Sequence, residues 1–226
     1  MKFLLLAGGK GTRLNKILIN KPKPLASLNG KPFILKILKN IILFKPEVIY
    51  ITVCHLKEKI IQTLGDNFHG FPIVYIKENN PLGTGGALIT GINNINCDGL
   101  IVLNADTYTE VNYLELKKEA EKKNKSQIVV MPIREADRFG SIKFDKKNKV
   151  YAINEKIDNG PGYINCGCYF FYKNHLNIFE NMKNYSLEKQ VLPKLINSNN
   201  LYAYHYDGKF IDIGIPSDLK RAQTYI

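Results

Sequence analysis

The chain has 226 residues, a length at which an α/β fold often forms one compact unit, so we expect a single domain over residues 1–226. Its composition, 45% hydrophobic and 23% charged, is that of an ordinary globular protein. No segment approaches the ~18 consecutive apolar residues of a membrane span, and no cleavage pattern follows the apolar run at 3–7, so we expect a cytoplasmic protein with no membrane partner. The formal net charge is +12, but acidic residues interrupt the densest lysine runs, at 115–125 and 145–149. This distribution favours small anionic ligands over nucleic acid.

The four cysteines, Cys54, Cys97, Cys166 and Cys168, form no C-x-x-C pair and have no histidine at a zinc-binding spacing. Cys166 and Cys168 are two residues apart and therefore share one face of a predicted strand, where they fit as packing residues. We expect four free thiols without a chemical role.

The first half of the chain alternates between predicted strands and predicted helices. The helix that begins at Pro32 carries apolar residues at i, i+3, i+4 spacing, the pattern of a face that packs on a core. The expected strands are 2–7, 47–53, 73–77 and 100–104, and the expected helices are the one from Pro32 to Ile42, one near 56–64 and one from about Thr84. This alternation indicates a parallel sheet with helices on both faces, which binds ligands at the carboxyl ends of its strands.

The second half of the chain has a less regular pattern. We expect helices near 112–124, 175–182, 186–197 and 216–225, and strands near 127–133, 140–145, 163–172 and 201–206. No repeat or low-complexity tract separates the two halves, which supports a single compact unit.

Strand 2–7 runs directly into the glycine-rich segment Gly8-Gly9-Lys10-Gly11-Thr12-Arg13-Leu14. Glycines leave backbone N–H groups open to phosphate because no Cβ blocks the approach. Arg13 and, further along, Lys23 add a planar guanidinium and a compact ammonium, the two cations that phosphoryl chemistry uses. Glycines alone could form an ordinary surface turn, but together with the two cations they indicate a triphosphate site. The Walker spacing and the dinucleotide G-x-G-x-x-G spacing are both absent.

The glycine-rich segment followed by Pro22-Lys23-Pro24-Leu25 resembles the signature of sugar-1-phosphate nucleotidyltransferases. Further matches follow in the order of that family, at Pro81–Ala87, Leu103–Asp106, Phe139–Gly140, Asn154–Lys156, Asn165–Gly167 and Phe210–Pro216. The short chain and the P-L-G-T-G-G-A segment are most similar to bacterial D-glycero-D-manno-heptose 1-phosphate guanylyltransferases. The alternatives within the family are mannose-1-phosphate guanylyltransferases and other sugar-1-phosphate uridylyl-, thymidylyl- or cytidylyltransferases.

This resemblance implies a Rossmann-like three-layer fold with a mixed, mostly parallel central sheet, in which residues 1–110 bind the nucleotide and residues 111–226 the sugar phosphate. It implies transfer of a nucleotidyl group from an NTP, with GTP favoured, to a sugar 1-phosphate for capsule or lipopolysaccharide synthesis. The expected partners are these two substrates, and a homodimer stays open. The alternative from another class is a non-catalytic regulatory subunit that binds a nucleotide-sugar, which would be expected to lack a catalytic cation or carboxylate.

In the implied reaction a phosphate oxygen attacks the α-phosphorus of the NTP, so charge neutralisation and alignment dominate the barrier. The resemblance assigns Arg13 to the leaving pyrophosphate and Lys23 to the phosphates of both substrates. Asp106 and Asp212 match the Mg²⁺-binding positions of the family, and Mg²⁺ prefers one or two carboxylates with phosphate and water oxygens. Asp106 alone could cap a turn, whereas Asp212 stands in an apolar run where a buried acid needs a partner.

The resemblance also assigns the remaining site residues. The nucleotide is expected at Leu6, Ala7, Gly8, Gly9, Gly11, Thr12, Glu78, Gly83, Thr84 and Asn104, and the sugar phosphate at Gly140, Glu155, Lys156 and Asn165. Glu78 stands where thymidylyl relatives use a glutamine, and its carboxylate could accept from guanine N1–H and N2–H₂ together, so we expect a preference for GTP. The alternatives are an exposed loop acid for Glu78 and an exposed strand-edge pair for Glu155 and Lys156.

Overall fold

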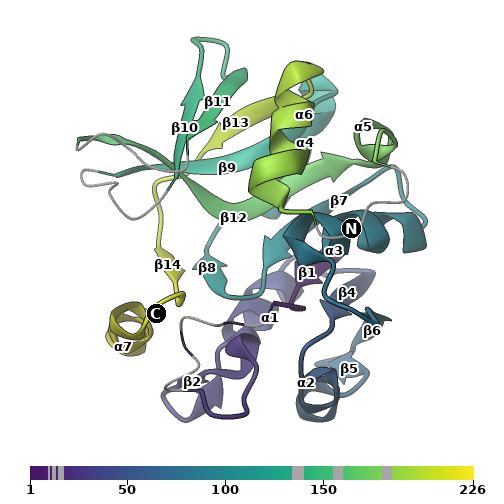
Figure 1. Cartoon of the computed structure of the whole chain (residues 1–226), viewed down its shortest axis with the longest axis vertical. Coiled ribbons are helices and arrows are strands. Elements are labelled where there is room, and N and C mark those ends of the chain that lie inside the picture. The colour runs from purple at the N-terminus through teal and green to yellow at the C-terminus, as the bar shows by residue number, and fades with distance from the viewer. Residues whose placement is uncertain (10, 12–13, 15–17, 134–139, 155–159, 180–184) are drawn as a thin grey trace.

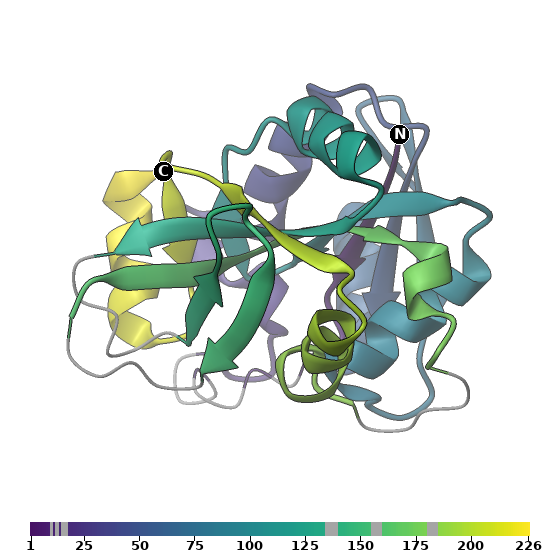
Figure 2. The ribbon, with the colours of Figure 1, turned by 90° about the horizontal axis from the view of Figure 1, so that it is seen from above.

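The computed structural model describes the chain apart from residues 10, 12–13, 15–17, 134–139, 155–159 and 180–184. In this part of the chain one ten-stranded mixed sheet forms the centre of the molecule, and helices cover both of its faces (Figures 1 and 2). The strands follow the order β11 (Val150–Asn154), β10 (Ser141–Phe144), β12 (Gly162–Tyr172), β7 (Gly99–Asn104), β1 (Lys2–Leu6), β4 (Val48–Val53), β6 (Phe71–Lys77) and β5 (Asn67–Phe68). In addition, β9 (Ser126–Ile133) pairs with β12 and with β13 (Leu201–His205).

Strand β1 is apolar from Phe3 to Leu6 because helices cover both of its faces. One face of the sheet carries α1 (Ile34–Ile42), α2 (Lys57–Leu64), α4 (Tyr113–Lys123) and α7 (Pro216–Tyr225), and the other carries α3 (Gly83–Asn94), α5 (Lys173–Leu176) and α6 (Leu192–Asn197). Phe3 and Leu5 belong to the first core, and Leu4 belongs to the second. Helix α3 packs closely because Gly91 has no Cβ, which would lie 2.5 Å from Leu4 Cδ2. None of the described helices is both long and apolar enough to cross a membrane.

The two halves of the chain contribute differently to the sheet. Strands β6, β4, β1 and β7, from the first half, are parallel, with Leu4 opposite Tyr50 of β4 and Val102 of β7. Strand β12 then pairs antiparallel with β7, β9 and β10. The predicted Rossmann-like three-layer fold with a mixed sheet is confirmed.

A two-stranded ribbon beside the main sheet joins the two halves of the chain. It pairs β8 (Thr107–Thr109) with β14 (Phe210–Asp212), and both are visible in Figure 1. Thr107 lies opposite Asp212, and the Ile213 N–H donates to the Asp106 carbonyl at 3.0 Å. The ribbon therefore brings the two predicted metal-binding carboxylates to the same place. A second small ribbon joins β2 (Ser27–Leu28) to β3 (Lys31–Pro32).

Most of the predicted strands and helices are confirmed within a few residues, with two corrections. The helix predicted near 175–182 is wrong, because α5 ends at Leu176 and residues 180–182 lie outside the described part. The helix predicted at 186–197 is divided into a π-helical turn, Leu187–Val191, and α6. Pro193 lacks the N–H that would donate to the Lys189 carbonyl in a regular α-helix, which favours this local change of winding.

Candidate active site

A cavity of about 330 Å³ lies at the carboxyl ends of β1 and β7. All the predicted nucleotide-binding residues that the structure describes line it, namely Leu6, Ala7, Gly8, Gly9, Gly11, Glu78, Gly83, Thr84 and Asn104. Thr12 and the predicted catalytic residue Arg13 lie outside the described residues. The glycine turn and the distant P-L-G-T-G-G-A segment thus form two walls of one cavity, as expected for the open end of a parallel sheet.

The glycine turn permits a close approach of Lys23. Gly11 has a φ of +61°, and a Cβ built on it would lie 3.1 Å from the Lys23 Cβ. The turn closes with a hydrogen bond from the Leu14 N–H to the Gly11 carbonyl at 2.9 Å. A side chain at position 11 would therefore crowd the lysine that lines the cavity beside it.

Three charged side chains meet where this cavity adjoins a second one. The Lys23 Nζ donates to Asp106 Oδ2 at 2.5 Å and lies 3.6 Å from Asp212 Oδ1. Lys23 is only 9% exposed. Asp106 lines the first cavity and Asp212 lines the second. The two carboxylates, far apart in the sequence, therefore face one shared cation at the boundary between the cavities.

The carboxylates are held in place by the ribbon of β8 and β14. Thr107 Oγ1 donates to Asp106 Oδ1 at 3.2 Å, and the backbone pairing fixes Asp212 opposite Thr107. A Cβ built on Gly214 would lie 3.0 Å from Asp212 Oδ1. The glycine after Ile213 therefore leaves room for the Asp212 carboxylate.

The donor set fits a hard divalent cation. Among the described residues no group of three or more His, Cys, Asp or Glu side chains gathers, so a protein-only metal cage is not formed there. Two carboxylates that converge on one ammonium nevertheless provide a place for positive charge. Mg²⁺ commonly takes one or two carboxylates and completes its shell with phosphate and water oxygens, so Asp106 and Asp212 could hold it.

Glu78 is a buried acid that lines the first cavity, so the alternative of an exposed loop acid is wrong. It is 5% exposed, and its Oε2 accepts from the Leu82 N–H at 3.1 Å. Its Oε1 is buried with no hydrogen-bond partner in the part of the chain that the structure describes. Burial raises the pKa of the Glu78 carboxyl, and the Leu82 N–H opposes this only in part. Such a carboxylate is expected to gain from a ligand that donates hydrogen bonds.

The second cavity has a volume of about 810 Å³ and is formed mainly by the second half of the chain. Gly140 and Asn165, both predicted to bind the sugar phosphate, line it. The other two predicted residues, Glu155 and Lys156, lie outside the described residues, although Asn154, the last residue of β11, lines this cavity.

A bulge in β12 sets the position of Asn165. The register between β12 and β9 shifts between Asn165 and Tyr169, where β12 has more residues than the stretch of β9 opposite it. Such a bulge changes the direction in which the side chains point. The Asn165 Nδ2 donates to the Tyr169 hydroxyl at 2.6 Å, and its Oδ1 accepts from the Gly167 N–H at 3.0 Å. Tyr169 is fully buried, and burial raises its pKa well above the usual value. As predicted, the four cysteines are not joined by disulfides, and burial raises the pKa of Cys166 to about 12.

Asn104 belongs to both cavities. Its Oδ1 is buried without a hydrogen-bond partner among the described residues, so it offers an acceptor to a ligand. Gly167 has a φ of +64°, and a Cβ built on it would lie 2.8 Å from the Asn104 Nδ2. The bulge of β12 therefore also sets the room available to Asn104.

Several residues that line the second cavity were not among the predicted site residues. Ser186, Glu188 and Lys189 come from the π-helical turn and its amino-terminal end, and Thr107 and Phe210 come from the short ribbon. The π-helical turn has no periodic pattern that marks it in advance. Phe210 precedes Asp212 in a matched segment, and that position was the available clue.

Comparisons with known proteins agree with this arrangement. A sequence profile described as nucleotidyl transferase matches residues 2–226. The chain is 32% identical over 218 residues to the D-glycero-alpha-D-manno-heptose 1-phosphate guanylyltransferase of Campylobacter jejuni, with 96% of each chain covered. It is 34% identical to the crystal structure of HddC from Yersinia pseudotuberculosis, with a TM-score of 0.87 over 99% of this chain and 98% of that one. A structure of HddC complexed with GMP-PN gives 33% identity and a TM-score of 0.86 over the same shares of the two chains. The chain belongs to the nucleotidyl transferase family.

Proposed function

We propose that this protein transfers a guanylyl group from GTP to D-glycero-α-D-manno-heptose 1-phosphate, giving a GDP-sugar and pyrophosphate. Support comes from a curated heptose 1-phosphate guanylyltransferase that aligns over nearly the whole chain, and from the fold shared with a structure that contains GMP-PN. We place this reaction in the cytoplasm, as a step in the synthesis of a surface polysaccharide.

The observation that carries the proposal is the position of Lys23 between Asp106 and Asp212 where two cavities adjoin. We assign the nucleotide to the 330 Å³ cavity, here called the nucleotide cavity, and the sugar to the 810 Å³ cavity, here called the sugar cavity. In this arrangement the α-phosphate of GTP and the phosphate of the sugar meet at the three charged groups. Such positioning can supply a large part of the rate enhancement.

The bond changes follow from this placement. An oxygen of the sugar phosphate attacks the α-phosphorus, a new P–O bond forms, and the bond to the pyrophosphate oxygen breaks. The attacking oxygen is already ionised at neutral pH, so no general base is required. Lys23 offsets the charge of the two approaching phosphates, and we assign Arg13, on the resemblance alone, to the leaving pyrophosphate.

We further propose that Asp106 and Asp212 hold Mg²⁺ when both substrates are bound. The ion would neutralise phosphate charge and orient the oxygens for in-line displacement. Asp106 and Asp212 are suited to this because the ribbon of β8 and β14 holds both carboxylates against one cationic group. With the ion on the two carboxylates, Lys23 would contact the substrate phosphates in place of its present carboxylate partners.

The base preference is assigned to Glu78. Guanine offers N1–H and N2–H₂ as neighbouring donors, and a carboxylate is an acceptor only, so the two match in a way that uracil and thymine cannot. The buried Oε1 of Glu78, which has no partner among the described residues, makes this match more valuable. On the sugar side we assign Gly140 and Asn165, together with Glu155 and Lys156 on the resemblance alone.

A substrate matrix tests the function directly. GTP, UTP, dTTP, CTP and ATP are each combined with D-glycero-α-D-manno-heptose 1-phosphate, mannose 1-phosphate and glucose 1-phosphate, and pyrophosphate release is measured. The highest kcat/KM is expected for GTP with the heptose phosphate. A clear preference for mannose 1-phosphate would change the sugar assignment and keep the chemistry. Absence of pyrophosphate release with every pair would contradict an enzymatic role and favour a regulatory subunit.

A further inference from the structure

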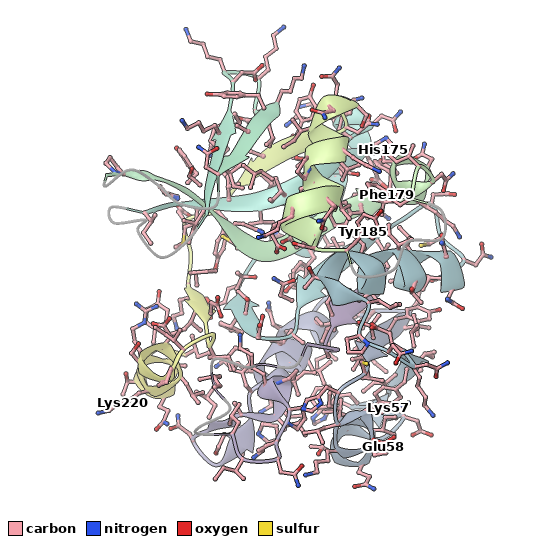
Figure 3. All side chains as sticks on the ribbon, viewed as in Figure 1. Lys57, Glu58, His175, Phe179, Tyr185 and Lys220 are labelled. Carbon is pink, nitrogen blue, oxygen red and sulfur yellow. The ribbon has the colours of Figure 1, made fainter. Side chains whose placement is uncertain are left out.

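The nucleotide cavity and the sugar cavity share a structural connection. Residues 82–84 line the nucleotide cavity, whereas Ser186, Glu188 and Lys189 line the sugar cavity. The second set belongs to the segment 185–191, here called the bridge segment, which packs on the amino-terminal end of α3. Figure 3 shows Tyr185, the first residue of the bridge segment, next to α3.

Backbone hydrogen bonds attach the bridge segment to α3. The Tyr185 carbonyl accepts from the N–H groups of Gly85 (2.7 Å) and Gly86 (3.3 Å), and the Tyr185 N–H donates to the Leu82 carbonyl at 2.9 Å. A Cβ built on Gly83 would lie 2.4 Å from the Tyr185 carbonyl oxygen, so the absence of a side chain there permits this contact. Two amide groups in the first turn of α3 are therefore used by the protein and are not left for a phosphate.

Thr84 adds a side-chain bond to this connection. Its Oγ1 accepts from the Leu187 N–H at 2.9 Å, and Leu187 is the fully buried first residue of the π-helical turn. Thr84 itself is exposed to the open nucleotide cavity, where water competes for its hydroxyl. A nucleotide in this cavity would exclude that water, and hydrogen bonds become stronger when the local dielectric falls.

We infer that Thr84 is a positioning residue that couples the two cavities, so that a bound nucleoside triphosphate favours binding of the sugar phosphate. A bond that holds the Leu187 N–H in place restricts the conformation of the π-helical turn. Glu188, the next residue of this turn, lines the sugar cavity, and its carboxylate accepts from Ser186 Oγ at 3.1 Å. Restricting the turn therefore restricts the position of Glu188 in the sugar cavity. This inference rests on the proposed function. It goes beyond the direct nucleotide contact that the family resemblance gives Thr84, because the consequence is measured at the other substrate.

Binding measurements on Thr84→Val test the coupling. Valine has the shape of threonine without the acceptor oxygen, and Thr84→Ser keeps that oxygen. Thr63→Val is the matched control, since Thr63 lies on α2 and its hydroxyl donates to the Lys59 carbonyl, away from both cavities. Calorimetry gives the Kd of heptose 1-phosphate with and without saturating α,β-methylene-GTP, which binds but cannot react.

In the wild type, Thr84→Ser and Thr63→Val, the GTP analogue is expected to tighten heptose 1-phosphate binding about fivefold or more, and the reverse experiment must give the same factor. In Thr84→Val the factor is expected to fall below about twofold, whatever the change in the affinity for the GTP analogue alone, and heptose 1-phosphate alone is expected to bind with little loss of affinity. A merely structural defect would weaken the binding of both ligands and leave unchanged the factor by which one tightens the binding of the other. Coupling retained in Thr84→Val, or absent from the wild type, overturns the inference.

A measurement without ligands separates this inference from the proposed function. Amide exchange at Leu187 is expected to be about tenfold faster in Thr84→Val than in the wild type, Thr84→Ser or Thr63→Val, with α6 unchanged as an internal reference. Unchanged exchange at Leu187 would overturn the inference whichever substrates the enzyme uses. Absence of turnover in the substrate matrix would contradict the proposed function and leave the exchange result to stand by itself.

Discussion

The nucleotide cavity and the sugar cavity are built by different means. The nucleotide cavity lies at the ends of parallel strands, and many of its lining residues are small, among them Gly8, Gly9 and Gly11. The sugar cavity is larger and depends on side chains from antiparallel strands, a strand bulge and a π-helical turn. A glycine-rich wall lets backbone N–H groups approach phosphates, which are common to all NTPs, whereas a wall of larger side chains can be changed to suit different sugars.

The three charged groups between the cavities belong to both, so the largest effect is expected there. Lys23→Ala is expected to reduce kcat by about 10²–10³-fold, because it removes positive charge that acts on the phosphates in the transition state. Steady-state pyrophosphate release measures this loss. Lys117→Ala, at a partly exposed lysine of α4 that pairs with Glu121, is the control and should keep full activity. Near-normal turnover of Lys23→Ala would show that this charge does not act on the phosphates in the transition state.

Gly167→Ala tests the contact between the cavities at Asn104. The φ of +64° and the 2.8 Å approach to Asn104 Nδ2 predict that an added methyl group displaces this side chain. Because Asn104 lines both cavities, we expect kcat/KM to fall about tenfold, with raised KM values for both substrates. Gly30→Ala is the matched control, since Gly30 has a φ of +80° but open space around it. That variant should lose some thermal stability and no activity. A raised KM for only one substrate would show that Asn104 serves one cavity alone.

Glu78→Gln tests whether a side chain gives the nucleotide cavity its specificity. A glutamine presents one acceptor and one donor group, so it cannot match the two guanine donors together, and the preference for GTP over UTP is expected to fall about tenfold. Competition between the two nucleotides measures the ratio. Glu58→Gln, on the exposed side of α2, should leave it unchanged. An unaltered ratio in Glu78→Gln would assign base selection to other residues.

The smallest effect concerns pH. Burial raises the pKa of Glu78, so the folded protein binds this proton more tightly than the unfolded chain does. The free energy of unfolding therefore falls as the pH rises from the ordinary glutamate pKa through the raised pKa of Glu78, and at neutral pH the ionised carboxylate destabilises the fold. Glu78→Gln is expected to raise the Tm by a few degrees at pH 7, with the gain fading below the ordinary glutamate pKa. A gain that is independent of pH would contradict the buried-charge explanation.

Sequence patterns predicted the nucleotide cavity better than the sugar cavity, for a physical reason. Parallel strands covered on both faces, such as β1, are continuous apolar runs, and the glycines that follow them mark close backbone approach. Asp106 and Asp212 were placed together by the resemblance, and the short ribbon that joins them has no periodicity of its own. The π-helical turn is held by a bond from the Leu187 N–H to the distant Thr84, and the β12 bulge is a shift of register against β9, so neither is contained in single-residue propensities.

Binding of Mn²⁺ in the presence of α,β-methylene-GTP, measured by electron paramagnetic resonance, tests most directly whether the two distant acids form one centre. If Asp106 and Asp212 hold one ion between the cavities, Asp106→Asn and Asp212→Asn each weaken binding by about tenfold or more, and the double variant is far less impaired than the product of the two losses. Normal Mn²⁺ affinity in either single variant, or losses that multiply independently, would contradict a shared site.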